Sequence, residues 1–181
     1  MRKLSYHVAT TLDNYISHED GSIEGFLAEG EHVTDYIESL KAYDTVLMGR
    51  TTYEWGIKFG GLQPGQTGYP WMKNYVFSRT LRFDSEPDQQ LEIIAENQLD
   101  FVKQLKQGEG TDIYLCGGGA FAAFLLEHEL IDELKIKLNP IIYGSGVRLF
   151  GQSTKKVALS LVDSKIYQSG VLLLTYKLNY S

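Results

Sequence analysis

In three segments of the chain, an apolar run is followed directly by residues of types that can bind an anion. They are "LMGRTTYEW", "YVFSRTLRF" and "IYLCGGGAFAAFLL", which carry Gly49–Thr51, Ser78–Thr80 and Gly117–Gly119 at the joint. Glycines let a phosphate approach the backbone closely, and the first N–H groups of a following helix are unpaired at the positive end of its dipole. Arginine can hold a phosphate through two parallel hydrogen bonds. These joints predict a phosphate-bearing ligand.

Each joint also has a purely structural alternative. Three consecutive glycines could instead allow tight strand-to-helix packing, and a lone arginine at a strand end is often a solvated charge. Thr51 and Glu54 have the spacing of a capping box, which predicts a helix that begins at Thr51, next to Arg50. That position beside a helix N-terminus favours anion binding by Arg50.

The pattern along the chain places these joints in an α/β sheet. Leu4, Tyr6 and Val8 alternate with polar residues as in a half-buried strand, and apolar residues in 33–40 recur with helical spacing above a polar side that carries Asp35 and Glu38. Further strands are predicted at 44–49, 74–78, 91–95 and 112–116, and helices at 97–107, ended by Gly108, and at 120–130.

Three strand-like runs without helices between them follow, at 134–144, 157–167 and 170–180. The expected fold is therefore a three-layer α/β domain over residues 1–181, with a central mixed, mostly parallel sheet and antiparallel C-terminal strands. Two long loops are predicted, at 11–26 and at 59–70.

If these strands are parallel, the three joints lie along one edge of the sheet, where open α/β sheets bind their ligands. One elongated ligand could then contact all of them. A glycine joint and two arginines suit a dinucleotide with a pyrophosphate and an extra 2′-phosphate, which favours NADPH over NADH. The glycines do not follow the first strand and are contiguous, so they do not form the GxGxxG fingerprint.

Composition excludes several classes of partner. The net charge is −6, and the 17 Lys and Arg residues are scattered, which argues against nucleic-acid binding. No apolar run approaches the roughly 20 residues that cross a bilayer, so no membrane partner is expected. The single cysteine, Cys116, excludes an intrachain disulfide, and the four histidines lack metal-ligand spacing. A cytoplasmic protein without a metal is expected, and the apolar run 170–178 suggests a homodimer.

At this point the quoted segments can be compared with known families. "MGRTTYEW", "NYVFSRT" and "YLCGGGAFAAFLLEHELIDELKI" resemble segments of dihydrofolate reductases in the same order, and "HVATTLDNYIS" resembles their first strand and loop. "LIDELKIKLNPIIYGSGVRLF" is more similar to the reductase domain of the bifunctional riboflavin-biosynthesis deaminase/reductase, a branch of the same fold. The resemblance implies the three-layer fold described above and a reductase that binds NADPH across the strand ends.

Carried over by motif, the resemblance assigns residues to parts of the cofactor. The pyrophosphate and 2′-phosphate would lie on Gly49, Arg50, Thr51 and Thr52, and the adenosine on Ser78, Arg79 and Thr80. The late glycine joint, Cys116, Gly117, Gly118, Gly119, Ala120 and Phe121, would contact the pyrophosphate, and Ala9 and Ile16 would flank the nicotinamide.

Two positions depart from the family patterns. Riboflavin-pathway reductases commonly have a glutamate before the glycine pair, where this chain has Leu115 and Cys116. Dihydrofolate reductases have an acidic residue on the first helix. An ungapped alignment puts Val33 of this chain at that position, and a small shift of the alignment puts Asp35 there. Asp35 is the candidate catalytic acid; the alternative is that Asp35 is only a solvated charge on the polar face of the helix. Cys116 could be a reactive thiol or a small core residue.

The substrate class therefore stays open between a pyrimidine of riboflavin biosynthesis, specifically 5-amino-6-(5-phosphoribosylamino)uracil, and a dihydrofolate or other pterin. A nucleotide-binding protein that has lost the catalytic acid is a third hypothesis. Tyr69, Trp71 and Tyr75 could stack on a planar ring or pack beneath the loop. No residue type in the quoted segments decides between these three functional hypotheses.

Overall fold

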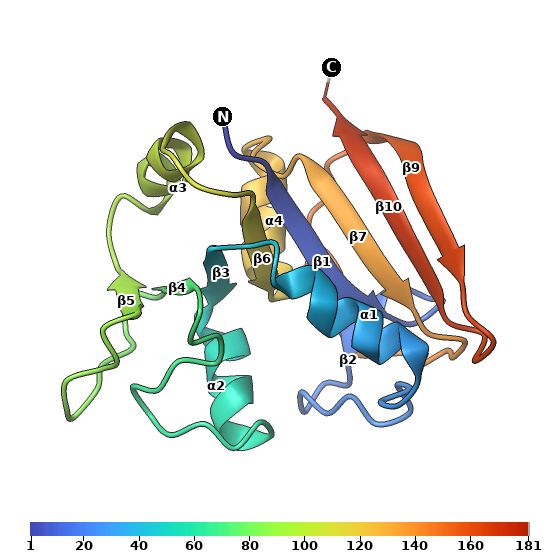
Figure 1. Cartoon of the computed structure of the whole chain (residues 1–181), viewed down its shortest axis with the longest axis horizontal. Helices are drawn as coiled ribbons and strands as arrows, with labels where there is room; N and C mark the ends of the chain where they lie inside the picture. The colour runs from blue at the N-terminus through green and yellow to red at the C-terminus, as the bar shows by residue number, and fades with distance from the viewer. Residues whose placement is uncertain (181) are drawn as a thin grey trace.

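The computed structural model describes residues 1–180 and forms one large sheet with four helices (Figure 1). The eight strands of the sheet have the order β5-β4-β3-β6-β1-β7-β10-β9. All pairs from β5 to β7 are parallel, and β10 runs antiparallel to both β7 and β9. The predicted mixed sheet with antiparallel C-terminal strands is confirmed.

The elements have the following bounds. The strands of the large sheet are β1 (Leu4–Thr10), β3 (Thr45–Gly49), β4 (Lys73–Phe77), β5 (Leu91–Ile94), β6 (Ile113–Gly117), β7 (Glu133–Leu138), β9 (Ala158–Ile166) and β10 (Leu172–Asn179). The helices are α1 (Glu31–Leu40), α2 (Arg50–Lys58), α3 (Gln98–Gln107) and α4 (Gly119–Glu127). A separate two-stranded sheet pairs β2 (Tyr15–Ser17) with β8 (Val147–Arg148).

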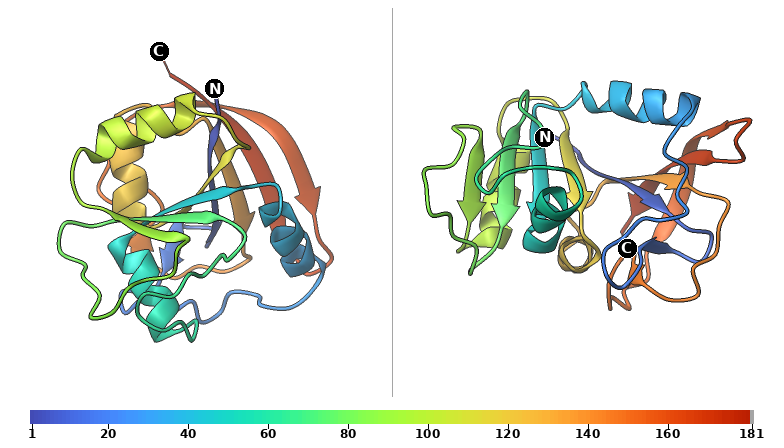
Figure 2. Two further views of the ribbon diagram at one scale, coloured as in Figure 1. Left: turned by 60° about the vertical axis from the view of Figure 1, so that its left-hand side comes forward. Right: turned by 90° about the horizontal axis from the view of Figure 1, so that it is seen from below.

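The helices cover the sheet in two outer layers. Figure 2 shows α1 on one face and α3 and α4 on the other. The core beneath α4 contains apolar side chains of β1, β3 and β6, including Leu4, Leu47 and Leu115, with Leu125 of α4. The core beneath α1 is the more aromatic, and includes Tyr43, Tyr53 and Tyr114. These two cores give the three-layer arrangement that the sequence predicts.

Two details of patterning differ from expectation. β1 is buried on both faces, because Ser5 and His7 lie under α1 while Leu4 and Tyr6 face α4, so the prediction of a half-buried strand is wrong. On α1, Ile37 is 51% exposed although its spacing placed it on the apolar side. The helix lies obliquely above polar and aromatic side chains rather than on a uniform apolar surface.

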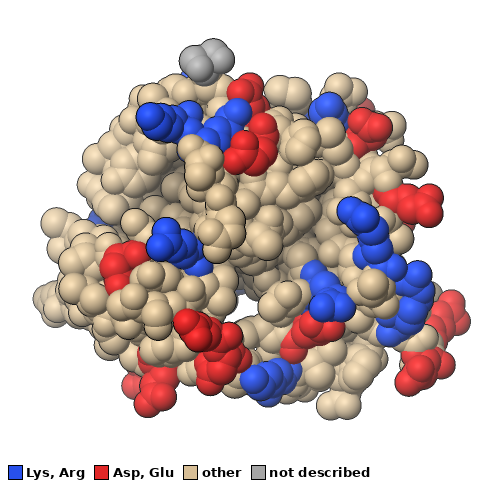
Figure 3. Space-filling model, turned by 180° about the vertical axis from the view of Figure 1, so that it is seen from behind, with Lys and Arg blue, Asp and Glu red and all other residues tan. Residues whose placement is uncertain are grey.

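Loop segments also contain structure that the sequence did not indicate. β2 lies within the predicted loop 11–26, and β8 has only two residues, too few to show alternation. Their pairing joins the first long loop to the segment after β7. Among the described residues, no helix is long and apolar enough to span a bilayer. Basic and acidic side chains are interspersed over the surface in Figure 3, without a basic stripe on that face.

Candidate functional site

The strand register brings the three predicted joints to one edge of the sheet. Gly49 at the end of β3 is paired with Phe77 at the end of β4, and Met48 is paired with Gly117 at the end of β6. Because these strands are parallel, their carboxyl ends lie side by side, and the segments that follow them emerge at the same edge.

The N-termini of α2 and α4 meet at this edge. A Cβ atom built on Gly49, the N-cap of α2, would lie 3.9 Å from the backbone nitrogen of Gly118, the N-cap of α4. Neither N-cap makes a side-chain hydrogen bond to its helix. Two sets of unpaired helix N–H groups therefore face the same region, an arrangement that attracts anions.

The predicted capping box at Thr51 is wrong. The helix begins one residue earlier, at Arg50, with Gly49 as its N-cap. Glu54 instead lies 3.5 Å from Arg50 Nε, one helical turn away. The Thr-x-x-Glu spacing therefore reflects a helical ion pair rather than a cap.

Arg50 links the first joint to the second. Its Nη1 donates a hydrogen bond to Thr80 Oγ1 at 3.0 Å. Ser78 is buried, and its hydroxyl accepts hydrogen bonds from the backbone of Thr80 and Leu81, which closes the turn after β4. Arg79 is exposed beside this turn. The first joint thus presents an arginine, Arg50, that is already oriented by Thr80, and the second presents an exposed arginine, Arg79, that can contact a ligand.

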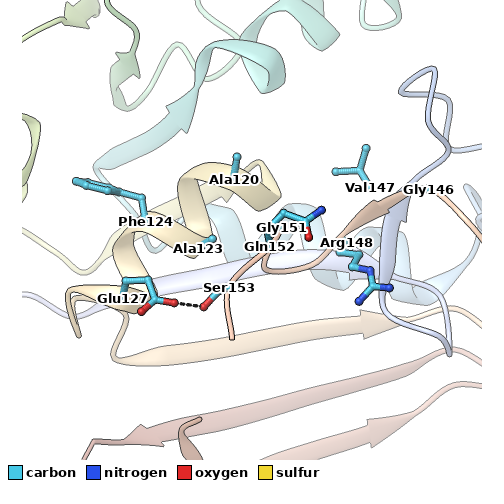
Figure 4. A pocket seen from close by; sticks show the side chains of 10 residues that line it. All are labelled: Ala120, Ala123, Phe124, Glu127, Gly146, Val147, Arg148, Gly151, Gln152 and Ser153. Atoms are coloured by element: carbon cyan, nitrogen blue, oxygen red, sulfur yellow. Dashed lines mark hydrogen bonds between the residues drawn. The ribbon is translucent and has the colours of Figure 1, made fainter. Parts of the chain in front are cut away.

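Two surface cavities lie beside α4, and Phe124 lines both. One has a volume of about 540 Å³ and is lined by Arg79 and by residues 95–100, which follow β5. The other has a volume of about 610 Å³ and lies between α4 and the segment around β8, with Ala120 and Arg148 in its lining. Figure 4 shows Glu127 and Ser153 hydrogen-bonded at its floor. Of the three residues predicted to contact the adenosine, Arg79 lines the first cavity, whereas Ser78 and Thr80 do not.

The glycines at the joints also have packing roles. A Cβ atom on Gly119 would lie 2.1 Å from the carbonyl oxygen of Arg148, so α4 and β8 could not approach as they do. A Cβ atom on Gly49 would lie 3.2 Å from that of Phe121. Gly118 is different, because its Cβ would meet only Thr52 Oγ1, at 3.0 Å, and its backbone is partly exposed. Gly118 is therefore the glycine whose missing side chain most directly leaves room for a ligand.

β1 and β6 separate toward this edge. Their pairing ends at Tyr6 and Leu115, although β1 continues to Thr10 and β6 to Gly117. Ala9 lies on the part of β1 that still pairs with β7 but no longer with β6, and Ile16 lies on β2; both are partly buried. The gap opens next to the glycine joint, in the place where the resemblance puts the nicotinamide ring.

Asp35 is bound by the β9–β10 hairpin. Its Oδ2 accepts hydrogen bonds from Lys165 Nζ at 2.6 Å and from the Tyr167 hydroxyl at 2.8 Å, both from the β9–β10 hairpin. Those hydrogen bonds lower the pKa of Asp35 below its usual value, while the pKa of Tyr167 rises to about 12, through burial and then through its bond to the carboxylate. The carboxylate is ionised at neutral pH and already has partners. The structure thus gives Asp35 a contact with the hairpin and does not bring it to the glycine joint.

The next residue of α1, Tyr36, turns toward the sheet instead. Its hydroxyl lies 2.7 Å from that of Tyr114, and its ring lies 4.7 Å from the ring of His7. Nearby, the Tyr69 hydroxyl lies 3.5 Å from Cys116 Sγ. We call these five residues the phenol cluster. The sequence analysis assigned no role to His7, Tyr36 or Tyr114, because they come from three separate segments and carry no motif.

Of the three aromatic residues considered for ring stacking, only Tyr69 lies in this cluster. Trp71 is 51% exposed, and Tyr75 packs against Phe101 on the opposite face of the sheet. Burial raises the pKa of the Cys116 thiol, and this effect is larger than the opposite effect of hydrogen bonds from the Tyr114 and Tyr69 hydroxyls. Cys116 is thus a neutral thiol. Among residues 1–180, no three His, Cys, Asp or Glu side chains are grouped to hold a metal ion.

This combination of a mostly parallel sheet and divergent β1 and β6 defines an α/β domain with the dihydrofolate reductase-like fold. The family model described as "RibD C-terminal domain" matches residues 2–173. The chain belongs to the RibD C-terminal domain family. The suspected relationship to riboflavin-biosynthesis reductases is confirmed at the level of the family.

Relatives extend over nearly the whole chain. The uncharacterized proteins YwjB and YyaP of Bacillus subtilis (strain 168) are 33% and 30% identical to it, over 95% and 98% of this chain respectively and 96% of each relative. A putative riboflavin biosynthesis protein from Shewanella sp. PV-4 has a TM-score of 0.81 at 22% identity, over 99% of this chain and 100% of that one. Dihydrofolate reductase from Enterococcus faecalis, solved with NADP(H), has a TM-score of 0.65 at 17% identity, over 98% and 97%. The two structures show that the fold is shared.

Proposed function

We propose that this protein is an NADPH-dependent reductase of a small heterocyclic substrate, resembling 5-amino-6-(5-phosphoribosylamino)uracil reductase of riboflavin biosynthesis. The observation that carries the proposal is the meeting of two helix N-termini without side-chain caps, at Gly49 and Gly118, beside two arginines. Backbone N–H groups and guanidinium groups are what a pyrophosphate and a 2′-phosphate require. The membership of the RibD C-terminal domain family supports a reductase.

The residues present fit the cofactor. Gly49, Thr51, Thr52 and the late joint from Cys116 to Phe121 would hold the pyrophosphate. Arg50 would hold the 2′-phosphate, and Ser78, Arg79 and Thr80 would border the adenosine, with Arg79 also lining the cavity of about 540 Å³. Ala9 and Ile16 would flank the nicotinamide, which supplies a hydride when it is bound.

The test is a titration with NADPH and with NADH, followed by quenching of tryptophan fluorescence and by the melting temperature. Trp55 belongs to α2, so its emission should report a ligand at the N-terminus of that helix. Micromolar NADPH binding with much weaker NADH binding is expected, and a ligand of the native state should raise the melting temperature. If neither nucleotide binds, the proposed function is wrong.

A specific observation favours a second candidate, a nucleotide-binding protein without reductase activity. The carboxylate expected to act as the acid, Asp35, is held by Lys165 and Tyr167. NADPH oxidation that depends on an added pyrimidine or pterin would reject this candidate. Binding of NADPH without any oxidation across a panel of both ring types would support it. A dihydrofolate or pterin substrate belongs to the same panel.

We also propose that the protein forms a homodimer through β9. This edge strand is exposed along all nine residues, including Leu161 and Val162, and Ile166 is 79% exposed. A long apolar edge strand is a template for pairing with a second chain. Light scattering at micromolar concentration should give the mass of a dimer, and Leu161→Lys should give the monomer; a wild-type monomer would contradict this.

A cytoplasmic location stays a prediction.

A further inference from the structure

The phenol cluster contains polar groups that the fold leaves without partners. His7 is 1% exposed, and both of its ring nitrogens lack a hydrogen-bond partner among the described residues. Burial, with Lys135 and Lys137 nearby, lowers the pKa of His7 to about 3, so the ring is neutral. A buried polar group without a partner is costly, which suggests that this region is shaped for a ligand.

The cluster lies next to the proposed cofactor site. Tyr114 and Cys116 are the residues of β6 that face α1, and Gly117 follows them directly. Tyr36, Tyr69 and Cys116 are partly exposed, whereas His7 and Tyr114 are buried beneath them. A planar ring above this cluster would therefore border the gap between β1 and β6 where the nicotinamide is proposed.

The cluster offers neutral hydrogen-bond donors. Burial raises the pKa values of Tyr36, Tyr69 and Tyr114, so their hydroxyls keep their protons. Lys137 is partly buried, and the one side-chain hydrogen bond that it makes within residues 1–180 is a long one, 3.4 Å, to the carbonyl of Leu27. This set of side chains suits a ligand edge of carbonyl oxygens or ring nitrogens.

The nearest carboxylates on α1 and β7 already have partners. Asp35 is bonded to the β9–β10 hairpin, and Glu133 to Ser5 and Lys135. A carboxylate recognises amino groups, because it can only accept hydrogen bonds when ionised. The hydroxyls of the phenol cluster are therefore matched to a carbonyl or ring-nitrogen edge rather than to an amino-substituted one.

On these grounds, and resting on the proposed function, we infer that Tyr36 is the substrate-polarising donor of this reductase. If Tyr114 donates its proton to Tyr36 Oη, the Tyr36 hydroxyl is free to donate to a carbonyl oxygen or ring nitrogen of the substrate. Hydrogen bonds in such a chain strengthen one another. Tyr36 thus lies one residue after Asp35, the residue of the first helix that the sequence assigned as the acid.

Tyr36 acts on charge that develops in the reaction. As a hydride from the nicotinamide forms a C–H bond at a carbon conjugated with the acceptor atom, the π electron pair moves onto that atom. The Tyr36 hydroxyl stabilises this negative charge, and a proton from water then completes the reduction. The substrate gains two electrons and the dihydronicotinamide is oxidised. Because the phenol keeps its own proton, it needs no acidic pKa.

The test uses two probes with the same ring and opposite edges, lumazine with two carbonyls and 2,4-diaminopteridine with two amino groups. Each is titrated into the full chain by calorimetry, with and without NADP⁺. Lumazine should bind at least tenfold more tightly than 2,4-diaminopteridine. Tyr36→Phe should weaken lumazine binding about tenfold, and Asp35→Asn should change it less than twofold. Tyr75→Phe, which loses a hydroxyl on the opposite face, is the matched control.

A spectroscopic measurement separates polarisation from a structural role. The infrared carbonyl band of bound lumazine should lie at lower frequency in the wild type than in Tyr36→Phe, while melting temperatures show whether that variant is folded. Should Tyr36→Phe not fold, Tyr114→Phe, which removes the hydroxyl that supports Tyr36, should weaken lumazine binding about threefold. Preference for 2,4-diaminopteridine, or a loss caused by Asp35→Asn alone, would overturn the inference. NADPH binding, measured separately, judges the proposed function.

Discussion

The carboxyl-end joints and the face beneath α1 use different physics to prepare for a ligand. At the joints, two uncapped helix N-termini meet beside Arg50 and Arg79, so the groups available to a ligand are charged or strongly dipolar. Beneath α1, the phenol cluster is neutral, and the nearest carboxylate on the helix, Asp35, is held away. The difference suggests that phosphates are recognised by charge and the reacting ring by neutral donors.

Gly119→Ala should have the largest effect, on folding. The added Cβ would lie 2.1 Å from the carbonyl oxygen of Arg148, and backbone cannot move aside as a side chain can. We expect the free energy of unfolding to fall by about 1–3 kcal/mol, the usual cost of overpacking. Urea denaturation measures it, with Gly108→Ala as a control at a site that has only ordinary contacts. Equal stabilities would mean that β8 does not pack on α4 as described.

Gly118→Ala should separate ligand binding from packing. Its Cβ would meet only the Thr52 hydroxyl, which can rotate, so the loss of stability should be smaller than for Gly119→Ala. The methyl group would nevertheless stand where a pyrophosphate approaches the N-terminus of α4. We expect NADPH affinity to fall about tenfold, or about 1.4 kcal/mol. Unchanged affinity in a folded variant would assign all three glycines to packing.

His7 should make folding stability depend on pH. Its pKa is about 3 in the folded protein against 6.5 when unfolded, so below pH 6.5 the unfolded chain binds a proton that the folded protein does not. Stability should therefore fall as pH drops from 6.5 toward 3. Between pH 7.5 and 5.5, this costs about 1.4 kcal/mol. In urea titrations, His7→Leu should remove that part of the pH dependence of the free energy of unfolding. If the wild type and the variant instead show the same pH dependence, His7 is hydrated in the folded protein.

Asp35→Asn should have the smallest effect. The pKa of Asp35 is lowered by Lys165 and Tyr167, so the stability it contributes is present above the unfolded pKa and is lost as pH falls through the folded pKa. The variant should be slightly less stable than the wild type at pH 7, and the difference should shrink as pH falls below the unfolded pKa of Asp35. NADPH binding should not change. A loss of NADPH-linked activity with intact stability would restore Asp35 as the acid.

The sequence predicted the joints well because each depends on residues that are close in the chain. Strand-to-helix boundaries show as changes of periodicity, and glycine and arginine stand directly at them, as at Gly49 and Arg50. The family and the sheet followed from the order of these segments. The helix start was misplaced by one residue, because the Thr-x-x-Glu spacing of a capping box also suits an ion pair within a turn, as Arg50 and Glu54 show.

The phenol cluster could not be predicted because it is made by tertiary packing. His7, Tyr36, Tyr69 and Tyr114 come from a strand, a helix, a loop and another strand, and an aromatic residue in any of these is ordinary core. Which of two neighbours on α1 turns inward depends on the angle of the helix over the sheet, which periodicity does not give. One signal was available: His7 and Ser5 are polar residues in a strand at the centre of the expected sheet.

The most direct test of the account compares NADPH and NADH binding to the wild type and to Arg50→Ala, by fluorescence titration at fixed salt. The removed guanidinium should cost about 1–3 kcal/mol for NADPH, the scale of hydrogen bonds to a charged group, and little for NADH. Lys41→Ala, which removes an exposed lysine paired with Glu38 beyond the end of α1, is the control. Equal losses for the two nucleotides would contradict the 2′-phosphate assignment, and no binding of either to the wild type would contradict the account as a whole.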